Sequence, residues 1–259
     1  MRWNNHISQR VNNLQSGLLG ILIGLLLTST LASADQKTER WQEAIRRSDI
    51  ATLRQLIGPD VDVNAKSLYG KTALMLAAAD GDVSLMGRLI SFGADVSQVN
   101  RAGGNALMYA AQYGHAQAVQ HLINNGAKID HRGAKGWNAL MIAVLKGRLP
   151  VVDILLAHRA NPNLRDVLGW TPLMRATQND HHMIAQKLID MPETDINARN
   201  HAGQTALHIA TIVGAQKTAV LLIQKGADVT IRDNEENAPL DIAKQRGDAQ
   251  LVRSLSSPD

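Results

Sequence analysis

Four methionines at a fixed spacing are the first side chains in this sequence that could do chemistry. They are Met75, Met108, Met141 and Met174, each numbered 33 above the one before. A thioether is a soft metal ligand and can be oxidised, so such a ladder could bind Cu(I) or react with an oxidant. The alternative is that equivalent positions of stacked repeats share one environment, which methionine fills. We favour packing, and a copper titration of the purified protein tests the other interpretation.

Other chemically suggestive residues give no enzyme signature. His181 and His182 are neighbours, and adjacent side chains on a helix point about 100° apart, which is poor geometry for joint metal binding. The sequence contains no GxSxG, no HExxH, no GxxxxGK[ST] phosphate loop and no cysteine. We therefore predict a protein that is not an enzyme and that has no cofactor and no metal site.

Two tryptophans indicate a binding surface more specifically than the methionines indicate a metal site. Trp137 and Trp170 have the same spacing as the methionines, and each directly follows a glycine. If these glycines open projecting turns, the tip has no core to enter and both indoles should be exposed. Equivalent side chains would then lie about 10 Å apart, the spacing of packed helices. We predict one continuous apolar patch shared with Leu145, Val167 and Leu168; the alternative is that the indoles pack against each other and only shield the turns.

One repeat period must position all of these side chains. Gly70, Gly103, Gly136 and Gly169 are 33 apart, and Gly203 follows with one position more. Glu236 occupies the same slot one period after Gly203. A period of this length indicates a stacked array in which each unit contacts its neighbours.

The secondary structure of one repeat can be predicted from its own residues. Thr72 can cap a helix whose small and apolar residues recur at helical spacing, and Gly81 ends that helix. A second helix is predicted over residues 83–91, after which Gly93 supplies a left-handed turn. In the next two units, Asn105 and Asn138 replace the capping threonine. Each unit is therefore a helical hairpin with a projecting turn.

This pattern resembles the ankyrin-repeat family, with the resemblance covering residues 36–256. The clearest openings are GWTPLMRAT (169–177) and GQTALHIAT (203–211), and the successive closings read GADVS, GAKID, RANPN and GADVT. The resemblance implies an all-α solenoid of stacked helix-turn-helix units with projecting β-hairpin turns. It also implies a histidine at the start of a second helix, where His181 stands.

The predicted domain organisation follows from the repeat and its ends. Residues 1–34 are interpreted as a signal peptide and residues 35–259 as the ankyrin-repeat domain. Within that domain we expect an N-terminal cap at about 36–66 with Trp41 in its core, and a C-terminal cap at about 235–256. Repeats should start near 69, 102, 135, 168 and 202. One inserted residue within 190–195 should make a local bulge.

The N-terminus predicts export. Arg2 and Arg10 precede the apolar run 18–27, and Ala32-Ser33-Ala34 offers a cleavage site after Ala34. The alternative is an uncleaved anchor, but a spanning helix needs about 20 apolar residues. We expect a periplasmic protein without a stable membrane anchor after cleavage. Losing the leader lowers the net charge from +4 to +2, which gives no electrostatic case for nucleic acid.

The resemblance also implies where a partner binds. Members of the family hold partner proteins with the projecting turns and the inner face of the first helices, which together form the concave face. We therefore expect another protein to bind here, and the chain to be monomeric on its own. Exported bacterial relatives suggest an inhibitor or immunity protein for a secreted enzyme such as a phospholipase, or an accessory to a catalase. A haem- or small-molecule-handling protein is a further alternative. The predicted partner-binding residues are Trp137, Trp170, Tyr69, Tyr113, Leu145, Val167, Leu168 and Ile212.

Overall fold

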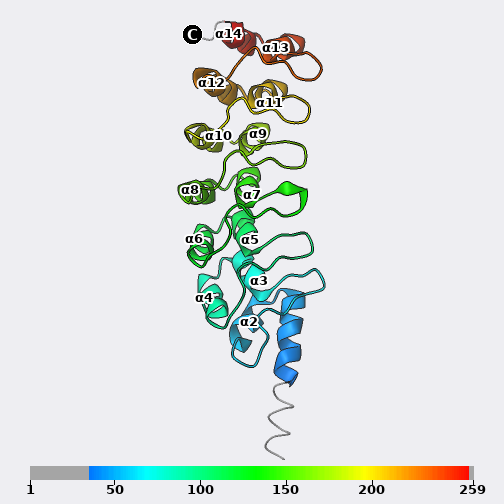
Figure 1. Cartoon of the computed structure of the whole chain (residues 1–259), viewed down its shortest axis with the longest axis vertical. Coiled ribbons are helices and arrows are strands. Elements are labelled where there is room, and N and C mark those ends of the chain that lie inside the picture. Colours follow the sequence, from blue (N-terminus) through cyan, green and yellow to red (C-terminus); the bar gives the residue numbers. More distant parts are fainter. Residues whose placement is uncertain (1–34, 257–259) are drawn as a thin grey trace, which may run out of the picture.

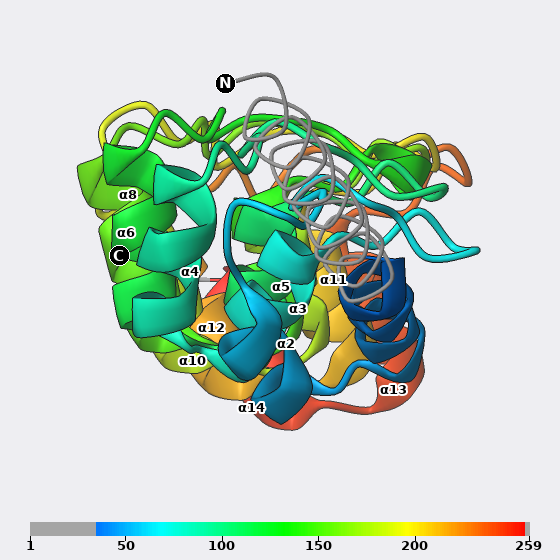
Figure 2. The same cartoon turned by 90° about the horizontal axis from the view of Figure 1, so that it is seen from below.

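A computed structural model describes residues 35–256; residues 1–34, with the predicted signal peptide or anchor, and 257–259 lie outside the described residues. Figure 1 shows pairs of helices stacked along one long axis, with turns that project beside the first helix of each pair. Seen along the stack, the first helices lie between the tips of these turns and the second helices (Figure 2). No helix within 35–256 is long and apolar enough to cross a bilayer.

The helices fall into two columns and confirm the all-helical solenoid. A helix over residues 35–47 and α2 (Ile50–Leu56) begin the stack. The first helices of the later pairs are α3 (Ala73–Asp80), α5 (Ala106–Tyr113), α7 (Ala139–Leu145), α9 (Pro172–Gln178), α11 (Ala206–Val213) and α13 (Pro239–Arg246). The second helices are α4 (Val83–Ser91), α6 (Ala116–Asn124), α8 (Leu149–Ala157), α10 (His182–Ile189), α12 (Gln216–Gln224) and α14 (Ala249–Ser256).

Side-chain caps start the first helices as the sequence predicts. The Thr72 hydroxyl accepts the backbone N–H of Met75 at 3.3 Å, and the Asn105 and Asn138 carbonyls accept equivalent N–H groups at 3.0 and 2.9 Å. Each cap satisfies an N–H that the first turn of a helix leaves without a partner. At the other end of α3, Gly81 has a φ of 79°, which confirms the predicted left-handed stop.

Leucine, isoleucine, valine and alanine side chains from both columns make one continuous core. The four methionines of the ladder are buried too, three of them at 1% exposed or less, while Met108 also lines an open hollow beside Gly104. Trp41 is fully buried in the first unit, as predicted, and its Nε1 donates to the Asp62 carbonyl at 2.9 Å. Each unit therefore buries its apolar face against the next one.

The projecting turns are short and closed by few bonds. In the third unit, Asn100 N donates to the Gly104 carbonyl at 2.9 Å, and Gly103 N donates to the Asn100 carbonyl at 2.9 Å. The described residues contain no β-strand, because each turn closes before a ladder can extend. One η1 segment (Ala134–Gly136) adds a 3₁₀ turn in the fourth unit.

Neighbouring turns are also joined to one another. Arg101 N donates to the Tyr69 carbonyl at 3.0 Å, and Val167 N donates to the Lys135 carbonyl at 3.0 Å. Equivalent bonds recur at the other junctions between turns, from the backbone N–H groups of Ala134, His201 and Asn234. The turns are therefore held in fixed register, and side chains at equivalent positions line up along the stack.

The inserted residue makes the local bulge that the sequence predicts. After α10, the Thr194 hydroxyl donates to the Leu188 carbonyl at 2.5 Å and Thr194 N donates to the Met191 carbonyl at 3.0 Å. In several other units the corresponding turn uses a glycine with positive φ, such as Gly93 or Gly126. Because α10 still packs against both α8 and α12, the array continues through the bulge.

A pair of adjacent glycines tests what holds the turns in register. Gly103 has a φ of +73°, and a β-carbon there would lie 3.1 Å from Gly133 Cα, so Gly103→Ala should destabilise the fold by about 1–2 kcal/mol. Gly104 has no such φ and is the control, since a β-carbon there would meet no backbone and would lie 3.2 Å from the Asn100 side-chain amide. Urea midpoints measure both. Equal midpoints would show that Gly103 is not constrained.

Candidate partner-binding site

The two tryptophans lie where their turns meet the first helices. Both indoles are half-buried and pack against the core cluster. The prediction that a turn tip has no core to enter is therefore wrong for Trp137 and Trp170. The reason is that each ring folds back from the turn onto the stack, leaving only part of its surface to solvent.

A single carboxylate connects the Trp137 indole to the backbone of Trp170. Asp166 Oδ1 accepts the backbone N–H groups of Leu168 at 2.8 Å and Trp170 at 3.0 Å. Its Oδ2 accepts the indole Nε1–H of Trp137 at 3.4 Å and the Nε–H of Arg175 at 3.1 Å, and the Nη2 of Arg175 forms an ion pair with it. The Asp166 side chain is 1% exposed, so these partners replace the water it has lost.

The charge of Asp166 is held by these contacts. Burial by itself would raise the pKa of the carboxyl. The hydrogen bond from Arg175, the N–H groups of Leu168 and Trp170, and the Arg175 charge outweigh burial and hold this pKa below its usual value. Asp166 is therefore ionised at neutral pH and fixes Arg175, whose side chain is 12% exposed.

Cations cover part of both indole rings. The Arg175 guanidinium lies 4.3 Å from the Trp170 ring centroid, and the Lys135 ammonium lies 5.3 Å from that of Trp137. Such contacts are cation–π interactions. The Asp166–Arg175 pair contacts both tryptophans, and the continuous apolar patch with Leu145, Val167 and Leu168 stays a prediction.

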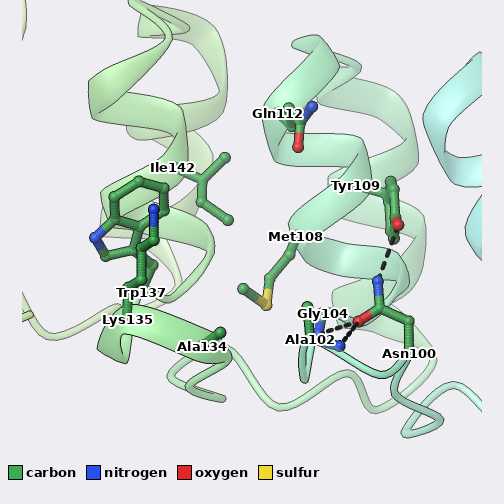
Figure 3. A pocket seen from close by; sticks show the side chains of 10 residues that line it. All are labelled: Asn100, Ala102, Gly104, Met108, Tyr109, Gln112, Ala134, Lys135, Trp137 and Ile142. Carbon is green, nitrogen blue, oxygen red and sulfur yellow. Dashed lines mark hydrogen bonds between the residues drawn. The ribbon is translucent and has the colours of Figure 1, made fainter. Parts of the chain in front are cut away.

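A hollow of about 280 Å³ opens on the other side of Trp137. Figure 3 shows Trp137 and Ile142 on one side of it, and Tyr109 on the other, with Met108 between them. The Tyr109 hydroxyl accepts a hydrogen bond from Asn100 Nδ2 at 2.9 Å, which fixes the ring. The full lining is Asn100, Ala102, Gly104, Met108, Tyr109, Gln112, Ala134, Lys135, Trp137 and Ile142.

The remaining predicted residues divide between two ends of the first helices. Tyr69, Val167 and Leu168 lie at the tips of the turns and are 72%, 60% and 55% exposed. The others lie where first helices end, far from the turns: Tyr113 in α5, Leu145 in α7 and Ile212 in α11. Val167 and Leu168 are in the turn that carries Asp166, whereas Tyr69 is two turns away from Trp137.

Sequence reasoning missed Asp166, Arg175, Lys135, Tyr109 and the opening at Gly104. A signal for Asp166 exists, because the same slot of other turns also holds a side-chain oxygen that accepts a backbone N–H two or four residues later. These residues are Ser67, Asn100, Asn200 and Asp233. The Arg175 contact had no such signal, since it depends on how the turn folds back onto α9.

The buried histidine of α11 has a structural environment. His208 is fully buried, its Nδ1 lies 2.9 Å from the Thr205 hydroxyl, and its Nε2 lies 3.1 Å from the Asn237 carbonyl. Burial lowers the pKa of this imidazole below its usual value, which favours the neutral ring. Within the described residues no group of three or more His, Cys, Asp or Glu side chains could hold a metal ion.

The chain is similar to known proteins over its repeats. The family model described as ankyrin repeats (3 copies) matches residues 41–133, 127–200 and 184–259. A stretch of 83 residues is 31% identical to a putative ankyrin repeat protein of Acanthamoeba polyphaga mimivirus, and 61 residues are 38% identical to NF-kappa-B inhibitor alpha of Gallus gallus. These stretches cover 32% and 24% of this chain, but only 11% and 19% of the relatives.

The Asp166 ion pair predicts a pH-dependent loss of stability. Asp166→Asn should keep the two backbone hydrogen bonds and lose the charge that faces Arg175, at a cost of about 2 kcal/mol at pH 7. Since the folded-state pKa is depressed, the contribution is full above the unfolded-chain value of about 3.9 and is lost as the pH falls through the lower folded-state pKa. Urea midpoints at neutral and acid pH measure it.

Asp233→Asn is the matched control for that measurement. Asp233 accepts two backbone N–H groups in the same way, at 3.0 and 3.1 Å, and forms no ion pair with any residue the structure describes. We expect it to change the midpoint little. Equal effects of the two substitutions would mean that the Arg175 pair contributes nothing.

Proposed function

The chain belongs to the ankyrin-repeat family, and from this premise we propose that it binds another protein through its concave face and turn tips and catalyses no reaction. Ankyrin repeats are in general protein-interaction modules. The observation that carries the proposal is the fixed cluster of Trp137, Trp170 and Arg175 at the junction of turns and first helices. Tryptophan and arginine are the side chains that most often dominate binding energy.

The mechanism is rigid presentation. Turns joined by backbone hydrogen bonds, and indoles held against the core, have already lost most of the freedom that binding would otherwise remove. The exposed Val167 and Leu168 stand beside the cluster and can exclude water around it. A partner would therefore meet a surface that needs little rearrangement.

We place this binding in the periplasm. The support is the leader in residues 1–34, in which a basic segment, an apolar run and small residues before Asp35 follow in the order of a secretory signal. The chain would act as a monomer without a stable membrane anchor once the leader is removed.

An inhibitory role is the version of this proposal with most support. One similar protein carries the name NF-kappa-B inhibitor alpha. An inhibitor of a secreted lipase-like enzyme would need an apolar surface of its own to cover the apolar surface around the enzyme's active site. The exposed side chains of Tyr69, Val167 and Leu168 provide such a surface. Self-intoxication of a deletion strain would favour this role, whereas sensitivity to oxidants would favour an accessory role beside a catalase.

The tryptophans give the direct test of the binding surface. Trp137→Ala and Trp170→Ala should each weaken partner binding by about 2 kcal/mol or more, because truncation empties the centre of the interface. The measurement is crosslinking and pull-down from the native periplasm, followed by titration of the recovered partner. Thermal unfolding of each variant shows whether the array is intact.

Met183→Ala is the control, since Met183 is exposed on the second helix α10, away from the turns. It should leave the affinity unchanged. Unchanged affinity in both tryptophan variants would refute the assignment of the surface.

Export makes a separate prediction. Intact-mass measurement of the protein recovered from the periplasm should give a chain that begins at Asp35, because cleavage is expected after Ala34. Ala34→Leu would block the small-residue position and should leave the leader attached. A mature chain of the wild-type protein that still starts at Met1 would rule cleavage out.

A further inference from the structure

We propose that the hollow beside Gly104 is a socket for one large apolar side chain, presented by a partner segment whose flanking residues are acidic. This inference rests on the proposed function and assigns the chemistry of the partner. It concerns the space between Tyr109 and Trp137 shown in Figure 3.

The socket exists because one unit lacks a side chain. The residue after the opening glycine is Lys71, Trp137, Trp170 or Gln204 in other units, and it is Gly104 here; in the last unit Asn237 follows Glu236 at this slot. Gly103 needs to be glycine, since its φ is +73°, but Gly104 has no left-handed φ. The backbone therefore does not require a glycine at position 104, and the missing side chain leaves open space.

An equivalent unit shows that a side chain fits this slot. Asn200 accepts the N–H groups of Ala202 and Gln204 at 2.9 Å each, and Asn100 accepts the equivalent pair in the unit of Gly104. The Asn200 amide then bonds the Gln204 side chain at 3.3 Å, whereas the Asn100 amide turns to the Tyr109 hydroxyl. A larger residue at position 104 is thus compatible with the turn and would close the socket.

The walls of the socket suit an apolar side chain. Met108, Tyr109, Trp137 and Ile142 line it, and the polar atom of Tyr109 already has its partner in Asn100. Its volume of about 280 Å³ lies below the range of about 300–1,000 Å³ typical of drug-sized ligands. One side chain therefore fits the socket better than a haem or another large cofactor.

The rim selects for negative charge around that side chain. Lys135 lines the socket and its ammonium lies 5.3 Å from the Trp137 ring centroid; Lys71, 5.7 Å from the Tyr109 ring centroid, is outside the lining. Among the described residues Lys135 forms no ion pair. None of the ten lining residues is acidic. Carboxylates on a bound segment would meet the Lys135 ammonium in a site open to solvent, where charge complementarity steers binding.

Defined peptides test the socket before any natural partner has been identified. The first probe is a fluorescein-labelled peptide with a central phenylalanine between acidic residues; its companions replace the phenylalanine by alanine or the acids by lysine. Fluorescence anisotropy with the purified protein should show at least tenfold tighter binding of the first probe than of either companion. Equal binding of the three peptides would overturn the proposal, as would a preference for the lysine peptide.

Paired substitutions locate the binding. Gly104→Trp fills the socket with a side chain that two other units carry at this slot, and it should abolish the preference for phenylalanine. Gln204→Trp adds the same side chain in a more distant unit, outside the socket, and should leave the preference intact. Unfolding midpoints establish that both variants are folded; a Gly104→Trp variant that is folded and still selects phenylalanine overturns the proposal.

Two further outcomes separate this inference from the proposed function. If N-acetylphenylalaninamide alone binds as tightly as the acidic peptide, the hollow is a small-molecule site and the flanking charge plays no role, which refutes the socket for a partner segment. If Gly104→Trp captures the crosslinked periplasmic partner as well as the wild type while Trp137→Ala and Trp170→Ala do not, the surface is confirmed and the socket is refuted. Full capture by all three variants refutes the assignment of the surface and the socket with it, and failure of the wild type to capture any partner refutes the proposed function itself.

Discussion

The binding surface depends on how a side-chain oxygen holds each turn. In most units an oxygen at the base of the turn accepts one or two backbone N–H groups, and Asp166 does so with two bonds of 2.8 and 3.0 Å. A serine, asparagine or aspartate can each do this, and each occurs along the chain. Among the described turns only that of Asp166 has this oxygen in an ion pair, which ties the turn to the first helix α9 through Arg175.

That arrangement explains why two partly buried tryptophans can serve both the fold and a partner. The Trp137 indole N–H has its acceptor in Asp166, and the Trp170 ring has a guanidinium 4.3 Å from its centroid. Because the indole N–H of Trp137 already has an acceptor and the ring orientations are fixed, a partner could cover the exposed parts of the rings without leaving this N–H unpaired. Binding would also cost little side-chain entropy.

The repeat period allowed much of this structure to be predicted from sequence. The caps at Thr72, Asn105 and Asn138 and the extent of α4 follow from rules that act within a few residues, and the structure confirms them. The environment of the tryptophans could not be predicted in this way. It depends on contacts across units, such as the bond from Trp137 to Asp166 in the next turn. The use of the surface by a partner, and the export of the chain, stay predictions.

The socket shows how a stacked repeat can gain specificity by losing a side chain. Because register is fixed by bonds between turns, removing one residue's side chain leaves a gap whose walls, here Tyr109 and Trp137, belong to adjacent units and stay in place. An isolated loop would collapse into such a gap, whereas a turn bonded to both neighbours has no low-energy way to do so. A larger residue at position 104 needs no left-handed φ but must displace the Asn100 amide, 3.2 Å from its β-carbon, and the chemistry of the surface would change with it.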